Sequence, residues 1–172
     1  MSTVRDLLAR KKSHATAAPA SDPPASAAPG SATTTAGAAE RVIMVDATAT
    51  VLEAARLMTA RGIGGLLVRD AGGRMAGIFT ERDVLRRVVN DGRDPRSTTV
   101  ADVMTAPVLT VAPETTVAEC RQLFTGRRIR HLPVMERGEL CGVVTSGDVL
   151  AFEADEAKAT IEHLEGYVFS NR

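Results

Sequence analysis

The chain is poor in aromatic residues and carries no excess charge of either sign. Its 172 residues include no Trp, one Tyr and four Phe, and 21 Lys and Arg residues balance 21 Asp and Glu residues. A generic nucleic-acid coat needs a basic excess to neutralise phosphates, so the neutral balance argues against that class. Because 44% of the residues are apolar, a real core is expected, and it must be built from aliphatic side chains.

Long apolar runs and paired cysteines are also missing. No uninterrupted run approaches the ~18–20 apolar residues of a membrane helix, so membrane insertion is not expected. Cys120 and Cys141 fit no paired metal or redox spacing. A single disulfide is compatible with them, but two small apolar residues in a reducing cytosol are the favoured interpretation.

The N-terminus lacks the apolar stretch of a secretory signal. Its Arg and Lys content is also typical of an organelle transit peptide, but Asp6 and the helical pattern of Thr3–Arg10 favour a docking helix in a cytoplasmic protein. Residues 13–39 follow, with 11 Ala, four Pro and no Leu, Ile, Val, Phe or Met. Such a segment cannot bury enough apolar surface to offset its ordering entropy, so we expect a disordered linker.

The rest of the chain contains an internal repeat. Residues 50–68 align with 116–134 at an offset of 66, and residues 75–85 align with 140–150 after the loss of one turn residue. Two copies, not many, predict a pseudo-two-fold pair rather than a solenoid.

Each copy predicts the element order β-α-β-β-α. Each first helix begins at a Thr followed three residues later by Glu, which is the spacing of a capping box. Each hairpin contains a Gly-bearing turn. In order, the predicted elements of the two copies are strands 42–45 and 108–111, helices 50–60 and 116–125, strands 65–68 and 131–135, strands 75–79 and 140–144, and second helices from 81 and 146.

Each copy has a Thr-x-x-Asp tetrad where its last strand meets its last helix, at Thr80–Asp83 and Thr145–Asp148. Free backbone N–H groups and the helix dipole favour an anion at such a junction. The hydroxyl offers a donor to a phosphate, and the carboxylate offers an acceptor to ribose hydroxyls. The alternative is a helix cap with a favourable first-turn acid. Spacing alone leaves both open.

The sequence Gly-apolar-apolar-Thr-x-x-Asp-apolar, at residues 77–84 and again at 142–149, resembles the cystathionine-β-synthase (CBS) domain. The likeness to a stand-alone tandem pair of bacterial type, a Bateman module, covers about residues 3–12 and 40–155. It implies an α/β (α+β) fold of two repeats related by pseudo-two-fold symmetry, with helix 101–104 matching residues 4–7. The expected divisions are a docking helix at 1–12, the linker at 13–39, CBS repeats at 40–95 and 96–152, and a C-terminal helix at 153–172.

The resemblance implies that an adenine nucleotide (AMP, ADP or ATP) binds in the cleft between the repeats. The first copy has no cation at the position of Arg130. We expect Arg130 to contact the phosphates, so the second site should bind the nucleotide more tightly than the first. For Arg130, Arg82 and His131 the alternative is a solvated or packed side chain, and for the apolar members it is ordinary core. The expected first site comprises Thr80, Asp83, Arg82, Val45, Gly65 and Leu66. The expected second site comprises Thr145, Asp148, Arg130, His131, Leu109, Leu132 and Pro133.

No catalytic or metal-binding motif is evident. We therefore expect a non-catalytic regulatory module that needs no cofactor and acts on an unidentified protein in trans. A homodimer through the CBS helices is implied by the resemblance, and the C-terminal helix has an apolar face suited to such packing or to its own domain. The alternatives are a structural protein with empty sites and, against the charge balance, a single-strand nucleic-acid binder that uses Arg127, Arg128 and Arg130. The apolar face comprises Leu150, Phe152, Ala157, Ile161, Leu164 and Val168.

Overall fold

The computed structural model describes residues 2–17 and 42–170, with the side chains of 14–17 and 163–170 outside that description. These residues form two compact units. The first-repeat unit holds residues 42–109, and the second-repeat unit holds residues 2–17 and 110–170. Most of the expected linker, residues 18–39, lies outside the described residues.

The first-repeat unit contains a three-stranded sheet in the order β1-β2-β3. β1 (Met44–Asp46) runs parallel to β2 (Gly65–Arg69), which pairs in antiparallel fashion with β3 (Met75–Thr80). α2 (Val51–Arg61) connects the parallel strands, and the sheet leads into α3 (Glu81–Asp83), the π-helix η1 (Val84–Val89) and α4 (Val100–Val103). The first repeat therefore has the predicted element order.

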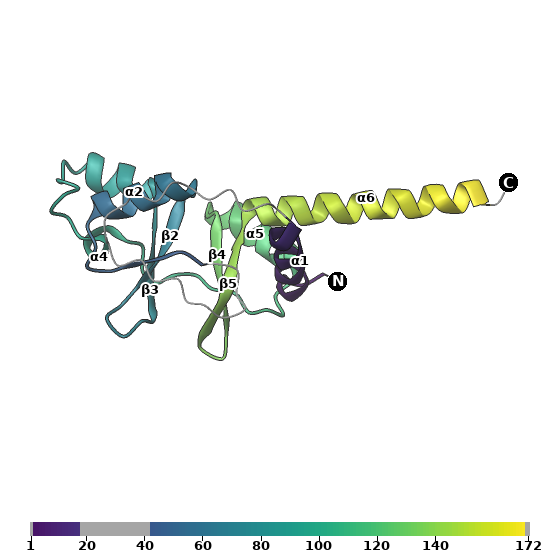
Figure 1. Cartoon of the computed structure of the whole chain (residues 1–172), viewed down its shortest axis with the longest axis horizontal. Helices are drawn as coiled ribbons and strands as arrows, with labels where there is room; N and C mark the ends of the chain where they lie inside the picture. The colour runs from purple at the N-terminus through teal and green to yellow at the C-terminus, as the bar shows by residue number, and fades with distance from the viewer. Residues whose placement is uncertain (1, 18–41, 171–172) are drawn as a thin grey trace. The chain divides into compact units, whose positions relative to one another are not determined.

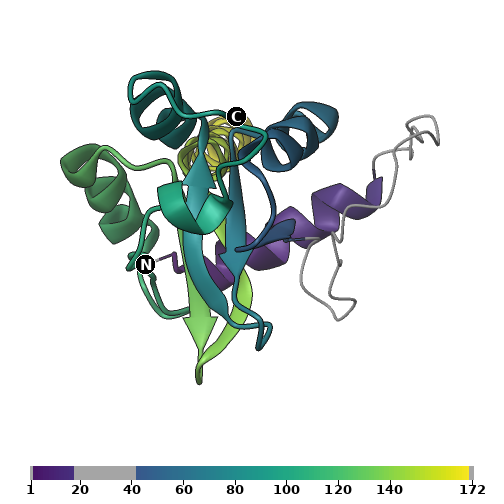
Figure 2. The same cartoon turned by 90° about the vertical axis from the view of Figure 1, so that its left-hand side faces the viewer.

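The second-repeat unit contains the hairpin of β4 (His131–Glu136) and β5 (Glu139–Thr145). α5 (Val117–Arg127) precedes the hairpin, and α6 (Ser146–Ser170) follows it as one unbroken helix (Figure 1). Figure 2 looks along the axis of α6. The expected boundary at residue 153 is therefore wrong, because the second CBS helix and the C-terminal helix are continuous.

The strand expected over residues 108–111 does not form. Only Val111 bridges to the sheet, donating to Pro133 O at 3.0 Å and accepting from Met135 N at 2.8 Å. Pro107 and Pro113 flank this segment and have no backbone N–H to donate, which limits a longer ladder.

The helix that precedes each repeat in the sequence packs in the core of the other repeat. Val4, Leu7 and Leu8 of α1 (Val4–Ala17) lie in the core of the second repeat. Val100 and Val103 of α4 lie in the core of the first repeat. The predicted boundary between residues 95 and 96 therefore differs from the structure, in which the first-repeat unit extends to Leu109.

Hydrogen bonds at their N-terminal caps show which residues of these two helices are equivalent. Thr3 caps α1 with Asp6 and bridges to Thr116, just as Thr99 caps α4 with Asp102 and bridges to Thr50. The expected match of residues 4–7 with 101–104 is thus out of register by one residue. α1 also extends to Ala17, beyond its expected end at residue 12, since Ala15 and Ala17 favour helix.

Candidate functional site

At the first Thr-x-x-Asp junction, both oxygens of the Asp83 carboxylate accept hydrogen bonds. Thr80 donates to Asp83 Oδ2 from its backbone N–H at 2.9 Å and from its hydroxyl at 2.7 Å. The Thr105 hydroxyl donates to Asp83 Oδ1 at 2.9 Å. Both carboxylate oxygens are therefore engaged within the first-repeat unit.

Arg87 adds a cation to this junction. Its Nη1 lies 3.5 Å from Asp83 Oδ1, donates to Val103 O at 2.8 Å and also donates to Met104 O. The Asp83 side chain is only 10% exposed. Burial of a carboxylate is costly unless hydrogen bonds and a cation offset it, and Asp83 has both, so the first junction has the character of a structural helix cap.

The second junction has the same cap but a different surrounding. Thr145 donates to Asp148 Oδ2 from its backbone N–H and its hydroxyl, both at 2.7 Å, and Asp148 N donates to Thr145 Oγ1 at 3.2 Å. Lys11 Nζ of α1 donates to the same Oδ2 at 3.1 Å. No residue in the described parts of the chain donates to Oδ1, and the Asp148 side chain is 20% exposed.

The remaining residues of the expected first site lie mostly in the core. Gly65 is opposite Thr80 in the β2–β3 ladder, as a shared site requires. Val45 and Leu66 are 5% and 1% exposed and pack in the hydrophobic cluster of the first repeat. Their side chains are not available to an adenine ring in this conformation. Arg82 is exposed on the first turn of the helix.

The β4–β5 hairpin brings several residues of the expected second site together, but Leu109 belongs to the first-repeat unit. His131 is opposite Thr145, and Arg130 O accepts from Ser146 N at 3.2 Å. The Arg130 side chain is exposed, and Leu132 and Pro133 are buried, which favours the core interpretation for these two. Leu109 is 42% exposed.

Three residues with contacts at the junctions were absent from the sequence-based sites: Lys11, Arg87 and Thr105. Arg87 could have been found, because it lies four residues after Asp83 on a helical segment. Lys11 is 137 positions from Asp148, and only the packing of α1 on the second repeat brings them together. Nothing in the local sequence signals that contact.

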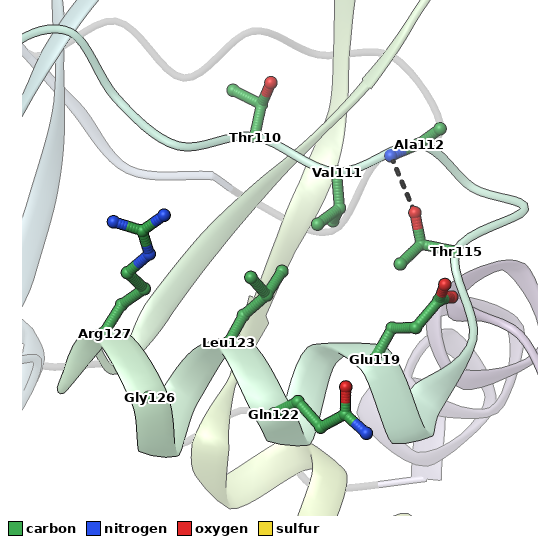
Figure 3. A pocket seen from close by; sticks show the side chains of 9 residues that line it. All are labelled: Thr110, Val111, Ala112, Thr115, Glu119, Gln122, Leu123, Gly126 and Arg127. Atoms are coloured by element: carbon green, nitrogen blue, oxygen red, sulfur yellow. Dashed lines mark hydrogen bonds between the residues drawn. The ribbon is translucent and has the colours of Figure 1, made fainter.

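Two cavities lie in the second-repeat unit. The larger, about 540 Å³, is a groove between α5 and the segment from Thr110 to Thr115. In Figure 3, Arg127 extends from α5 toward Thr110 at one end of it. None of the expected site residues lines this groove. The smaller, about 250 Å³, is lined by Asp148 and by Lys11, and its other lining residues are Leu7, Arg10, Ala151, Phe152 and Asp155.

Outside the two junctions, the described residues contain no further cluster of reactive or metal-ligating side chains. Cys120 and Cys141 are free thiols, Cys120 is buried in the core, and burial raises its pKa. The described ranges contain no group of three His, Cys, Asp or Glu residues that could hold a metal ion. Within them, no helix combines the length and the apolarity that crossing a membrane requires.

Comparisons with known proteins agree with the repeat geometry. The family model described as CBS domain matches residues 38–90 and 100–155. CBSX3, a mitochondrial CBS domain-containing protein of Arabidopsis thaliana, is 40% identical over 123 residues, which are 69% of this chain and 60% of CBSX3. The chain thus spans less than two thirds of that relative.

Solved structures share the fold. The CBS-domain-containing protein ATU1752 from Agrobacterium tumefaciens is 31% identical with a TM-score of 0.66, covering 87% of this chain and 91% of its own. CBSX2, solved in complex with AMP, is 24% identical with a TM-score of 0.57, covering 66% and 88%, a likeness that shows the fold alone. With two matched repeats over more than half of its length, the chain belongs to the CBS-domain family.

Proposed function

We propose that this chain is a non-catalytic regulatory module that binds an adenine nucleotide at its second Thr-x-x-Asp junction. The observation that carries the proposal is the state of Asp148. Its Oδ2 is fixed by Thr145 and Lys11, and no described residue donates to its Oδ1. A carboxylate held in this way is oriented to accept hydrogen bonds from a ribose diol, while the N-terminus of α6 favours a phosphate.

The first junction is a weaker candidate. A ribose at Asp83 would have to compete with the Thr105 hydroxyl and the Arg87 guanidinium for Oδ1, so the hydrogen bond that it gains is offset by the interaction that it replaces. This difference supports tighter binding at the second junction.

The choice of ligand rests on chemistry shared by AMP, ADP and ATP, each of which has a ribose diol and a phosphate. AMP is the first ligand to test, since CBSX2, which has the same fold, was solved in complex with AMP.

The alternative is a structural protein whose sites are empty, and a thermal-shift panel separates the two. Ligand that binds only the native state stabilises it by about 2.7 kcal/mol at a concentration 100 times Kd. We expect AMP, ADP or ATP to raise Tm, with GMP as the control for a phosphate and ribose on another base. If none of these, nor NAD(H) or S-adenosylmethionine, raises Tm, the structural alternative is favoured.

The same module is proposed to act as a homodimer. Leu85 and Val89 of η1 and Leu150 of α6 are 64–66% exposed, and Leu85 and Leu150 are equivalent positions in the two repeats. Exposed aliphatic side chains at equivalent places suit a self-complementary interface. Phe152 and not Leu150 faces the core of its own unit. A solution mass of one chain at micromolar concentration would contradict the dimer.

The regulated partner is proposed to be a separate protein that responds to the ligand-bound conformation. A cytoplasmic location belongs to the same proposal. Free thiols at Cys120 and Cys141 are compatible with a reducing compartment.

A further inference from the structure

Lys11 is held at the second junction by the packing of its own helix. Leu7 and Leu8, which precede it by one helical turn, are 2% and 8% exposed in the second-repeat core. Side chains three and four positions apart lie on the same helix face, so this anchoring points Lys11 toward the second repeat. Its Nζ donates to Asp148 Oδ2 at 3.1 Å and to Val143 O at 3.4 Å.

A phosphate at this junction meets an electrostatic problem. The first turn of α6 offers backbone donors, but the Thr145 hydroxyl already donates to Asp148, and that carboxylate places a full negative charge beside them. The helix dipole is equivalent to only about half a positive charge, which does not offset that carboxylate. An anionic ligand therefore needs a full cation here, and the exposed side chain of Arg130 has no contact with the junction among the described residues, which involves only its backbone carbonyl.

We propose that Lys11 is a phosphate-binding residue of the second junction, so that the N-terminal helix completes the nucleotide site. The proposal rests on the nucleotide binding proposed above. The ammonium carries a full positive charge beside Asp148, so it attracts a ligand phosphate while it stays paired with the carboxylate. Arg10 and Lys11 line the same cavity of about 250 Å³ as Asp148, so there is space beside the ion pair for a small anionic group.

The first junction provides an internal comparison. There the side chain that donates to the Asp from outside the motif is the neutral Thr105 hydroxyl, which binds Oδ1, whereas Lys11 binds Oδ2 at the second junction. Thr105 N also donates to Ile78 O, the counterpart of Val143 O. The nearby cation, Arg87, is bound to Val103 O and Met104 O. A phosphate-bearing ligand should therefore prefer the second junction.

Calorimetry with AMP and adenosine on the full chain tests this role, because adenosine has the same base and ribose without the phosphate. We expect Lys11→Met to weaken AMP binding by roughly ten- to a hundredfold, the effect of a lost hydrogen bond to a charged group. Adenosine affinity should fall much less, because Thr145 still holds Asp148 Oδ2 for the ribose, and Lys11→Arg should retain most of the AMP affinity. Lys12→Met, on the neighbouring exposed lysine, is the matched control and should bind AMP as the wild type does.

Two kinds of result would overturn the proposal. If Lys11→Met weakens AMP and adenosine equally, or neither, Lys11 does not act on the phosphate, although nucleotide binding itself stands. If the wild type binds neither ligand, the proposed function fails and the role of Lys11 fails with it. Thermal unfolding of each variant establishes that it is folded.

Discussion

Thr80 and Thr145 carry the same motif, and their local geometry is almost the same. Each donates its backbone N–H and its hydroxyl to Oδ2 of the Asp three residues later. The sequence could predict this because all the atoms lie within four residues. It could not predict what surrounds Oδ1, which depends on Thr105 at one junction and on no described donor at the other. The two junctions are thus distinguished by tertiary packing and not by the motif.

At the residue scale, Thr105→Val tests the structural role of the first junction. The Asp83 side chain is 10% exposed, and removing the Thr105 hydroxyl leaves its Oδ1 without a short hydrogen bond. We expect the free energy of unfolding to fall by about 1–2 kcal/mol, measured by urea denaturation. Thr110→Val, at an exposed threonine, is the control and should change stability by less than about 0.5 kcal/mol. Equal effects of both changes would contradict the role of Thr105.

At the scale of elements, prediction succeeded where the signal is local. The capping boxes of α2 and α5 are confirmed at Thr50 with Glu53 and at Thr116 with Glu119. Both hairpins are confirmed to within a residue or two at their ends. The strand over 108–111 failed because strand formation needs a distant partner, and only Val111 finds one.

The capping boxes predict a pH dependence of stability. Hydrogen bonds from the backbone N–H and then the hydroxyl of Thr50 lower the pKa of Glu53, and those from Thr116 lower the pKa of Glu119. Because the folded pKa is depressed, this stabilisation is present above the unfolded pKa of about 4.3. It is lost as pH falls from there through the lower folded pKa.

A double variant, Glu53→Gln with Glu119→Gln, should therefore show a shallower loss of stability than the wild type as pH falls below about 4.3. Urea denaturation at a series of pH values measures the slope. Glu139→Gln, at an exposed residue at the start of β5, controls for the removal of a charge as such. An unchanged slope in the double variant would show that these caps do not contribute to acid sensitivity.

At the scale of the whole molecule, the repeat was visible in the sequence, but the allocation of helices was not. Order along the chain places α1 before the first repeat and α4 before the second. In the structure, α1 packs in the core of the second and α4 in the core of the first. The choice is made by backbone bonds at the caps, Val4 N to Thr115 O and Val100 N to Ala49 O, which sequence order does not reveal.

This allocation connects both ends of the chain to one candidate site. Lys11 comes from the N-terminal helix and Asp148 from the start of the last helix, and the two form an ion pair. The central claim is that the second junction, completed by α1, binds the nucleotide while the first junction serves stability.

Calorimetric titration of AMP into Asp83→Asn and Asp148→Asn tests this claim most directly. We predict that the wild type binds AMP and that Asp148→Asn abolishes this binding. Asp83→Asn, at a temperature where it is folded, should retain it. Loss of binding in Asp83→Asn with full retention in Asp148→Asn would contradict it.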